Sequence, residues 1–176
     1  NMKTFIALTF IGILTYAYAA TTTGISKCQT VAPMEGFSAT KFFQRTWYVS
    51  HVQKKTSDTV CQTFSTSSPS DGVYVVEYSY GDNNVRCEAT RETDKKLTFN
   101  CKNGDTSFQA VFVIMATDFE KYALFYRCVT MSSGRKDDNY LVLSSTSGNE
   151  PIPDSLTSLT SGLGLQSCQA IRASVA

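Results

Sequence analysis

Alternating apolar and polar positions along most of the chain predict β-strands. From residue 46 onward, runs with a period of two are separated by turn residues such as Gly81-Asp82 and Asn103-Gly104. Evenly spaced strands with short turns favour an antiparallel sandwich or an up-and-down barrel. Eight strands are predicted, at Thr46–Gln53, Thr59–Thr66, Val73–Tyr80, Val85–Thr90, Lys96–Cys101, Ser107–Met115, Tyr122–Thr130 and Asn139–Ser145.

Two of these runs favour the barrel. Ser107–Met115 and Tyr122–Val129 are apolar on both faces, whereas a strand with one solvated face is polar at alternate positions. A barrel with an apolar interior cavity, partly covered on its outside by a helix, accounts for this pattern. The expected fold class is therefore all-β: an eight-stranded antiparallel up-and-down barrel with a short C-terminal helix.

Helical signals are confined to two short segments. A helical turn is expected from Ser38 to Phe43, with Ser38 as its N-cap. After the last strand, Pro153-Asp154 can start a second helix that ends at Gly162 and Gly164. We expect this helix to pack against the barrel through a face formed by Leu156, Leu159 and Leu163.

The N-terminus reads as a signal peptide. Lys3 precedes an apolar run from Phe5 to Tyr16, and Ala17-Tyr18-Ala19 supplies small residues at the positions that signal peptidase requires. The run is shorter than the ~20 residues that a transmembrane helix needs. We therefore expect a secreted protein with a signal peptide at residues 1–19, one domain at residues 20–176 and no membrane association.

Charge and cysteine content narrow the class further. Without Lys3 the chain has 16 − 1 = 15 basic residues against 15 acidic ones, a balance unsuited to nucleic acid. Six cysteines in an exported chain predict three disulfides, of which only Cys87–Cys101, across a hairpin, can be argued locally. One histidine and no CxxC motif argue against a structural zinc site, and no cofactor is expected.

Catalytic motifs are absent from the sequence. There is no G-x-S-x-G elbow or phosphate-binding glycine loop, and Asp137-Asp138 is interpreted as a solvated turn, so no enzyme is expected. His51 shares a strand face with Trp47 and Val49, the face expected to point inward. Three roles stay open for it: a hydrogen-bonded barrel histidine, a polar group that orients a ligand, and a haem ligand.

Several motifs resemble those of a known family. Thr46-Trp47-Tyr48-Val49 resembles the first lipocalin signature, and Ala116-Thr117-Asp118-Phe119 resembles the second. Together with Lys27-Cys28, Gly36-Phe37 and Asp137–Leu143, they make the chain similar to the triabin/procalin group, salivary lipocalins of blood-feeding bugs related to pallidipin and the nitrophorins. Two positions depart from the general pattern. Arg45 stands where glycine is usual, and the arginine of the third signature is not evident after Leu143.

The resemblance implies disulfide pairings and a ligand site. The implied pairs are Cys28–Cys128, Cys61–Cys168 and Cys87–Cys101, and the first of them requires Cys128 to point outward. The nitrophorin haem ligand lies on a later strand, where this chain has no histidine, so haem is not expected. The expected ligand-binding residues are Trp47, Val49, His51, Phe112, Phe125, Arg127, Val129 and Leu141.

The resemblance also implies a function, with alternatives. We expect a monomeric salivary protein that counteracts host haemostasis or inflammation by binding a small mediator, such as an eicosanoid, with Arg127 as partner for a carboxylate. The mediator could be an eicosanoid or an amine, but His51 stands where amine-binding relatives have an acidic residue, which favours the eicosanoid. The alternatives are an inhibitor of a host protease or contact-phase factor, acting through the loops Gln53–Asp58 and Gly81–Asn84, and an allergen that retains no ligand.

Overall fold

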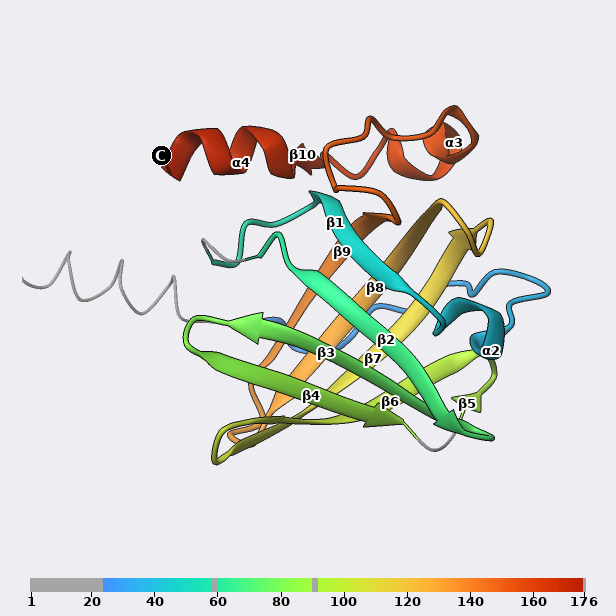
Figure 1. Cartoon of the computed structure of the whole chain (residues 1–176). Coiled ribbons are helices and arrows are strands. Elements are labelled where there is room, and N and C mark those ends of the chain that lie inside the picture. Colours follow the sequence, from blue (N-terminus) through green and yellow to red (C-terminus); the bar gives the residue numbers. More distant parts are fainter. Residues whose placement is uncertain (1–23, 58–59, 90–91, 176) are drawn as a thin grey trace, which may run out of the picture.

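Eight antiparallel strands follow one another around a barrel in this computed structural model, which describes residues 24–57, 60–89 and 92–175 (Figure 1). The barrel closes because the first strand pairs with the last as well as with the second, so the expected fold is confirmed. The expected signal peptide lies outside the described residues. The barrel strands are β1 (Thr46–Val52), β2 (Thr63–Ser70), β3 (Val73–Tyr80), β4 (Asn83–Ala89), β6 (Lys96–Asn103), β7 (Thr106–Thr117), β8 (Tyr122–Met131) and β9 (Lys136–Ser144).

Two short strands and several helical turns complete the fold. β5 (Glu92–Thr93) pairs with β6, and β10 (Gln166–Ser167) pairs with β1. The helical elements are α2 (Ala39–Phe42), the 3-10 turn η1 (Asp154–Leu156), α3 (Thr157–Thr160) and α4 (Cys168–Val175). The Ser38 side chain caps α2 by accepting a hydrogen bond from the Lys41 amide, as predicted.

Two predicted strands were misplaced. β2 begins at Thr63 rather than Thr59, and it includes Pro69. The register between β2 and β3 shifts at this point, so the backbone nitrogen of Pro69 is not needed as a hydrogen-bond donor to β3. β9 begins at Lys136, so Asp137 and Asp138 belong to a strand and the solvated turn predicted there is wrong. The polar residues at the start of β9 do not resemble a strand in the sequence. They are accommodated there because their hydrogen-bond partners come from distant segments of the chain.

The closed end of the barrel is packed with aromatic rings beside α2. The Trp47 ring stacks on Phe42 with centroids 4.9 Å apart, and Trp47 Nε1 donates to the Phe42 carbonyl oxygen at 3.2 Å. Arg45, which departs from the lipocalin signature, lies over the Trp47 ring with its Cζ 5.7 Å from the centroid. The guanidinium therefore covers the end of the core through a cation–π contact.

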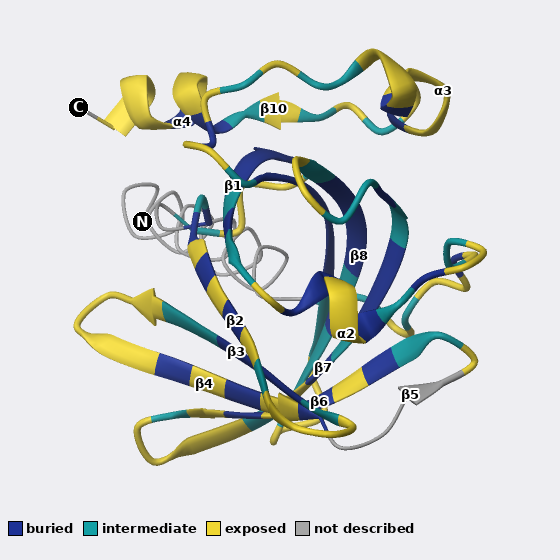
Figure 2. Cartoon of the chain, turned by 45° about the vertical axis from the view of Figure 1, so that its right-hand side comes forward, coloured by how far each residue is buried: buried dark blue, intermediate teal, exposed yellow. Residues whose placement is uncertain are grey.

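Extended segments, rather than a helix alone, cover the outer face of β7, β8 and β9. Val31 in the N-terminal segment packs there with Tyr126 and Tyr140, and the segment is joined to β8 by the Cys28–Cys128 disulfide. From the C-terminal side, Leu156 packs against Leu124 and Val142. This cover explains why β7 and β8 are apolar on both faces, and it leaves β8 buried or half-buried along its whole length (Figure 2).

The C-terminal segment differs from its prediction. The expected helix is split into η1 and α3, and Leu159 on it is 42% exposed rather than packed on the barrel. α4 was not predicted. It is joined to the barrel by Ile171, which is buried in the main core, and by the Cys61–Cys168 disulfide. α3, β10 and α4 thus run along the outside of the barrel beside β1 (Figure 1).

The turn between β7 and β8 is organised by one carboxylate. Asp118 Oδ1 accepts hydrogen bonds from the backbone amides of Glu120, Lys121 and Tyr122 at 2.7–3.1 Å. Desolvation alone would raise the pKa of Asp118, but these hydrogen bonds hold it below its ordinary value of 3.8. The same turn holds Phe119 at φ 68°, a conformation that L-residues rarely adopt.

Replacing Asp118 with Asn should destabilise the protein by about 1–2 kcal/mol at neutral pH, because charge-assisted hydrogen bonds to three amides become neutral ones. A depressed folded-state pKa stabilises the fold above pH 3.8, and this contribution is lost as the pH falls below that value. Urea unfolding at pH 7 and pH 3 measures both effects. The variant's deficit should shrink at pH 3, whereas Asp71→Asn in the exposed β2–β3 turn should change stability little at either pH.

Candidate ligand-binding site

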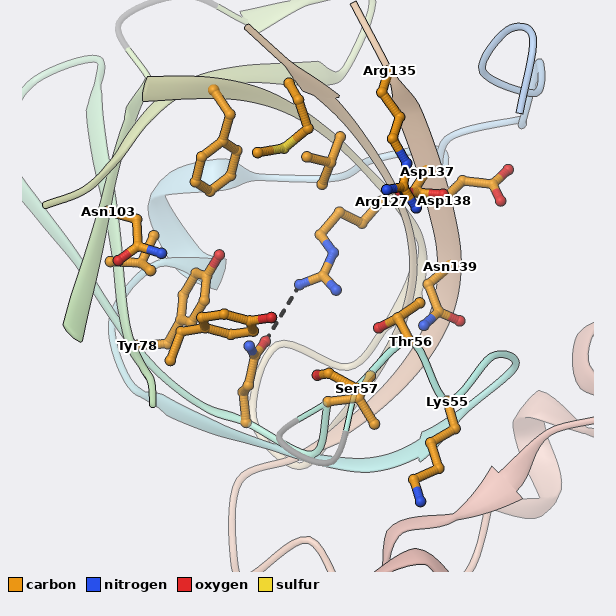
Figure 3. Close-up of a pocket in the computed structure, with 17 residues that line it drawn as sticks. Lys55, Thr56, Ser57, Tyr78, Asn103, Arg127, Arg135, Asp137, Asp138 and Asn139 are labelled. Atoms are coloured by element: carbon orange, nitrogen blue, oxygen red, sulfur yellow. Dashed lines mark hydrogen bonds and ion pairs between the residues drawn. The ribbon is translucent and has the colours of Figure 1, made fainter. Parts of the chain in front are cut away.

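A cavity of about 640 Å³ opens at the end of the barrel opposite α2 (Figure 3). Its walls come from β3, β4, β6, β7, β8 and β9 and from the segment between β1 and β2, so every part of the barrel mouth contributes. The lining residues are Lys55, Thr56, Ser57, Val60, Gln62, Tyr78, Tyr80, Val85, Asn103, Phe108, Arg127, Val129, Met131, Arg135, Asp137, Asp138 and Asn139.

The half of the barrel next to α2 is filled with side chains rather than hollow. Phe112 and Phe125 have ring centroids 5.0 Å apart, and Phe64 lies 6.2 Å from Phe125. The space left around Trp47 amounts to about 10 Å³, the room of roughly one water molecule. The aromatic floor, Phe64, Phe112 and Phe125, therefore limits the cavity to the upper part of the barrel.

The eight predicted ligand-binding residues consequently fall into three groups. Arg127 and Val129 line the cavity. Five others belong to the packed core and do not line it: Trp47, Val49, Phe112, Phe125 and Leu141. His51 lies on the other side of the barrel wall. The predicted orientation of β8 is confirmed, since Phe125 packs inward and Cys128 outward.

His51 was expected to point inward, and this prediction is wrong. Val49 lies opposite Leu143, but His51 lies opposite Val142, so β1 carries one extra residue at Ser50. Such a bulge reverses the faces of all later residues in a strand. Val52 consequently enters the inner core in place of His51.

The bulge places His51 between β9 and β10. It pairs with Ser167 of β10, and its Nδ1 lies 2.9 Å from Ser50 Oγ. Burial lowers the pKa of the imidazole, which favours its neutral form. Of the three roles left open, the structure therefore supports a buried, hydrogen-bonded histidine of the barrel wall.

Arg127 is the charged group at the bottom of the cavity. Its side chain extends across the barrel interior, and Nη1 donates to Gln62 Oε1 at 3.4 Å (Figure 3). Within the described residues it forms no ion pair with a carboxylate. Desolvation lowers the pKa of Arg127, an effect that the nearby Tyr78 partly opposes. The guanidinium thus keeps most of its donors available to a ligand.

Several cavity residues were not foreseen from the sequence. Met131 follows from the same alternation that places Arg127 and Val129 inward, continued by two residues. Gln62 and Tyr78 were missed because nothing near them in the sequence indicates which distant strand they face. At the rim, Arg135 and Asp137 form an ion pair with an N–O distance of 3.2 Å.

The rim segment after β1 is held by β9. Asn139 Oδ1 accepts from the Lys54 amide at 2.9 Å, and Asn139 Nδ2 donates to the Lys54 carbonyl at 2.8 Å. On the outer face, Lys54 Nζ lies 2.5 Å from Asp138 Oδ1, and Tyr126 donates to Asp138 Oδ2 at 2.7 Å. Both contacts fix the start of the segment that supplies Lys55, Thr56 and Ser57 to the cavity wall.

This network shifts the ionisation of its members. Desolvation would raise the pKa of Asp138, yet the hydrogen bonds and the positive charge of Lys54 lower it overall. Desolvation and the neighbouring Asp138 raise the pKa of Tyr126 to about 12. Near neutral pH, the network therefore contains an ionised carboxylate and a protonated phenol.

Replacing Asn139 with Leu should destabilise the protein by about 1–3 kcal/mol, because a side chain of similar size leaves both backbone groups of Lys54 without their partner. Amide exchange at Lys54 should become faster by more than the global change in stability explains. Hydrogen exchange followed by NMR measures both quantities. Asn100→Leu, on the exposed outer face of β6, is the matched control. Equal exchange at Lys54 in the two variants would mean that Asn139 does not hold the Lys54 backbone.

Comparison with known proteins agrees with this architecture. The Triabin family model matches residues 19–159. Procalin of Hospesneotomae protracta is 38% identical over 176 residues, covering 95% of this chain and 99% of procalin, and triabin of Meccus pallidipennis is 38% identical over 151 residues, covering 82% and 92%. A crystal structure of LTBP1 with leukotriene C4 has a TM-score of 0.68 at 24% identity, covering 84% of this chain and 97% of LTBP1.

The closed barrel with a ligand-sized cavity at one end defines a binding protein of the lipocalin class. Within that class, the chain belongs to the triabin family, whose members procalin and triabin are salivary lipocalins of triatomine bugs. These relatives are binding proteins rather than enzymes, which agrees with the prediction from the sequence. Among the described residues, no helix is long and apolar enough to cross a membrane, and no group of His, Cys, Asp and Glu could hold a metal ion.

Proposed function

We propose that this protein is secreted in saliva and counteracts host haemostasis or inflammation by sequestering a small amphipathic anion of the eicosanoid type. The observation that carries the proposal is Arg127, a guanidinium inside a cavity without a carboxylate partner among the described residues. A charge withdrawn from bulk water is costly unless it is paired. A ligand carboxylate is the group that best compensates it, because carboxylates can accept two parallel hydrogen bonds from arginine.

The rest of the cavity suits the apolar part of such a ligand. Val60 and Val85 are both 1% exposed, and Phe108, Val129 and Met131 add apolar surface around the guanidinium. These five apolar side chains share the cavity wall with polar and charged residues, which suits an amphipathic ligand rather than a purely apolar one. The volume of about 640 Å³ lies within the usual size of small-molecule sites. The fold likeness to LTBP1, whose crystal structure contains leukotriene C4, supports the same ligand class.

Calorimetry of the refolded protein tests the proposal with three probes: arachidonate, arachidonic acid methyl ester and serotonin. Arachidonate should bind with a stoichiometry of one, and the ester at least tenfold more weakly because it carries no charge for Arg127. Serotonin should not bind, because its ammonium group would lie near the positive charge of Arg127. Equal binding of ester and acid, tighter binding of serotonin, or uptake of no probe would each overturn the proposal.

A second function, inhibition of a host haemostatic protein through the barrel rim, is favoured by one observation. Tyr80 ends β3 beside the turn at Gly81 and is 44% exposed, among the largest exposures of any apolar or aromatic side chain described. Exposed tyrosines on loops often anchor protein interfaces. Under this alternative, Arg127→Gln leaves inhibition of the host protein intact and Tyr80→Ala weakens it, whereas under lipid sequestration Arg127→Gln abolishes lipid uptake.

A further inference from the structure

We infer that the ligand enters the barrel with its carboxylate first and keeps the end of its apolar tail at the mouth. This inference rests on the proposed function and specifies how the ligand lies in the cavity. It follows from the order of polar and apolar groups along the barrel axis, which places the charge at the bottom of the cavity.

The strand register fixes the depth of Arg127. Arg127 lies opposite Phe112 of β7, and the next inward residue toward the closed end of β8 is Phe125. Both rings belong to the aromatic floor and are less than 5% exposed. The guanidinium therefore stands directly on the packed core, and no space for a tail exists beneath it.

Apolar side chains lie between Arg127 and the mouth. Along β8 the inward positions after Arg127 are Val129 and Met131, which face Ala110 and Phe108 across β7. On the other side of the barrel, Val85 pairs with Tyr78 near the start of β4. We name Val85, Phe108, Val129 and Met131 the apolar collar. A tail that rises from Arg127 toward the mouth lies against this collar.

The opposite orientation is unfavourable on two counts. A tail inserted first would place methylene groups against an unpaired guanidinium and block its hydration, which is strongly unfavourable for a charged group. The carboxylate would then lie at the rim, where Arg135 is already paired with Asp137 at 3.2 Å. Carboxylate-first insertion satisfies Arg127 and leaves the rim pair intact.

This geometry predicts where the site discriminates among lipids. Substituents close to the carboxylate meet Gln62, Tyr78 and the aromatic floor, so they are expected to weaken binding. Substituents at the far end of the tail lie at the open mouth and should be tolerated. The site thus selects for the head of the molecule and accepts variation in its tail.

Stearate carrying a nitroxide at carbon 16 tests the orientation, with the protein labelled in its methyl groups. The bound nitroxide should broaden the methyl signals of Met131 and Val85 at least several-fold more than those of Ile114 and Leu143 near the closed end. Reduction of the nitroxide with ascorbate provides the diamagnetic reference. Stronger broadening of Ile114 and Leu143 would overturn the inference and leave the proposed function standing.

Binding without the label separates the two levels of the proposal. If calorimetry detects arachidonate but not 16-doxyl-stearate, and unlabelled stearate also binds, the tail end is enclosed and carboxylate-first insertion is wrong. If none of the three acids binds, the proposed function itself fails. Binding of all three with broadening at the collar supports both.

Discussion

Replacing Arg127 with Gln is expected to weaken arachidonate binding by roughly 30-fold or more. Removing one partner of a desolvated, hydrogen-bonded charge pair typically costs about 2–5 kcal/mol, and each 1.4 kcal/mol is about tenfold in affinity. Glutamine keeps a polar amide at this position but removes the charge that attracts the carboxylate. The variant should therefore bind the acid and its methyl ester with similar, weak affinity, as calorimetry at constant ionic strength can measure.

The same substitution should not destabilise the ligand-free protein. Arg127 is desolvated, and its hydrogen bond to Gln62 is long, at 3.4 Å. The ligand-free fold therefore gains little stability from the charge of Arg127. Urea unfolding should give a free energy equal to or above that of the parent. Arg86→Gln is the matched control, because Arg86 pairs with Glu77 on the outer face of the barrel. If both variants lose affinity equally, Arg127 has no specific role in binding.

The strand pattern could be predicted from the sequence because most barrel strands alternate between apolar and polar residues and end at a turn, and the two that do not alternate are rich in β-branched and aromatic residues. Ser107–Met115 and Tyr122–Thr130 lie within the observed β7 and β8. Their apolar outer faces were attributed to a covering helix, whereas the cover comes from two sides: an extended N-terminal segment joined by Cys28–Cys128, and the C-terminal segment around Leu156. Composition cannot distinguish these covers, since both bury the same apolar residues.

The candidate site was only partly predictable, for a different physical reason. Inward orientation follows from alternation, which placed Arg127 and Val129 correctly, but it fails wherever a strand carries a bulge. The extra residue at Ser50 is determined by the pairing of β1 with β9, so His51 could not be placed from local sequence. Depth in the barrel is equally non-local. Trp47 and Phe125 point inward as predicted, yet they fill the core rather than line the cavity.

Removing the Cys61–Cys168 disulfide should cause a larger loss of stability than any of the single substitutions considered. The bond links residues 107 apart in sequence, and for a loop of this length the chain-entropy model gives about 4–5 kcal/mol. It also holds the C-terminal segment, because β10 forms only two residue pairs with β1, His51 with Ser167 and Val52 with Gln166. The Cys61→Ala/Cys168→Ala variant should therefore unfold at lower urea and also release this segment locally.

The Cys28–Cys128 bond is the natural comparison because it links residues 100 apart, so its removal should cost a similar global free energy. The local consequences should differ. The N-terminal segment keeps backbone hydrogen bonds of 2.8 Å from Ile25 to Lys136 and from Met34 to Ile114, whereas α4 relies mainly on Ile171 and the disulfide. Hydrogen exchange should therefore show α4 amides losing protection only in the Cys61/Cys168 variant. Unchanged protection in that variant would mean that packing of Ile171, rather than the covalent bond, holds α4 on the barrel.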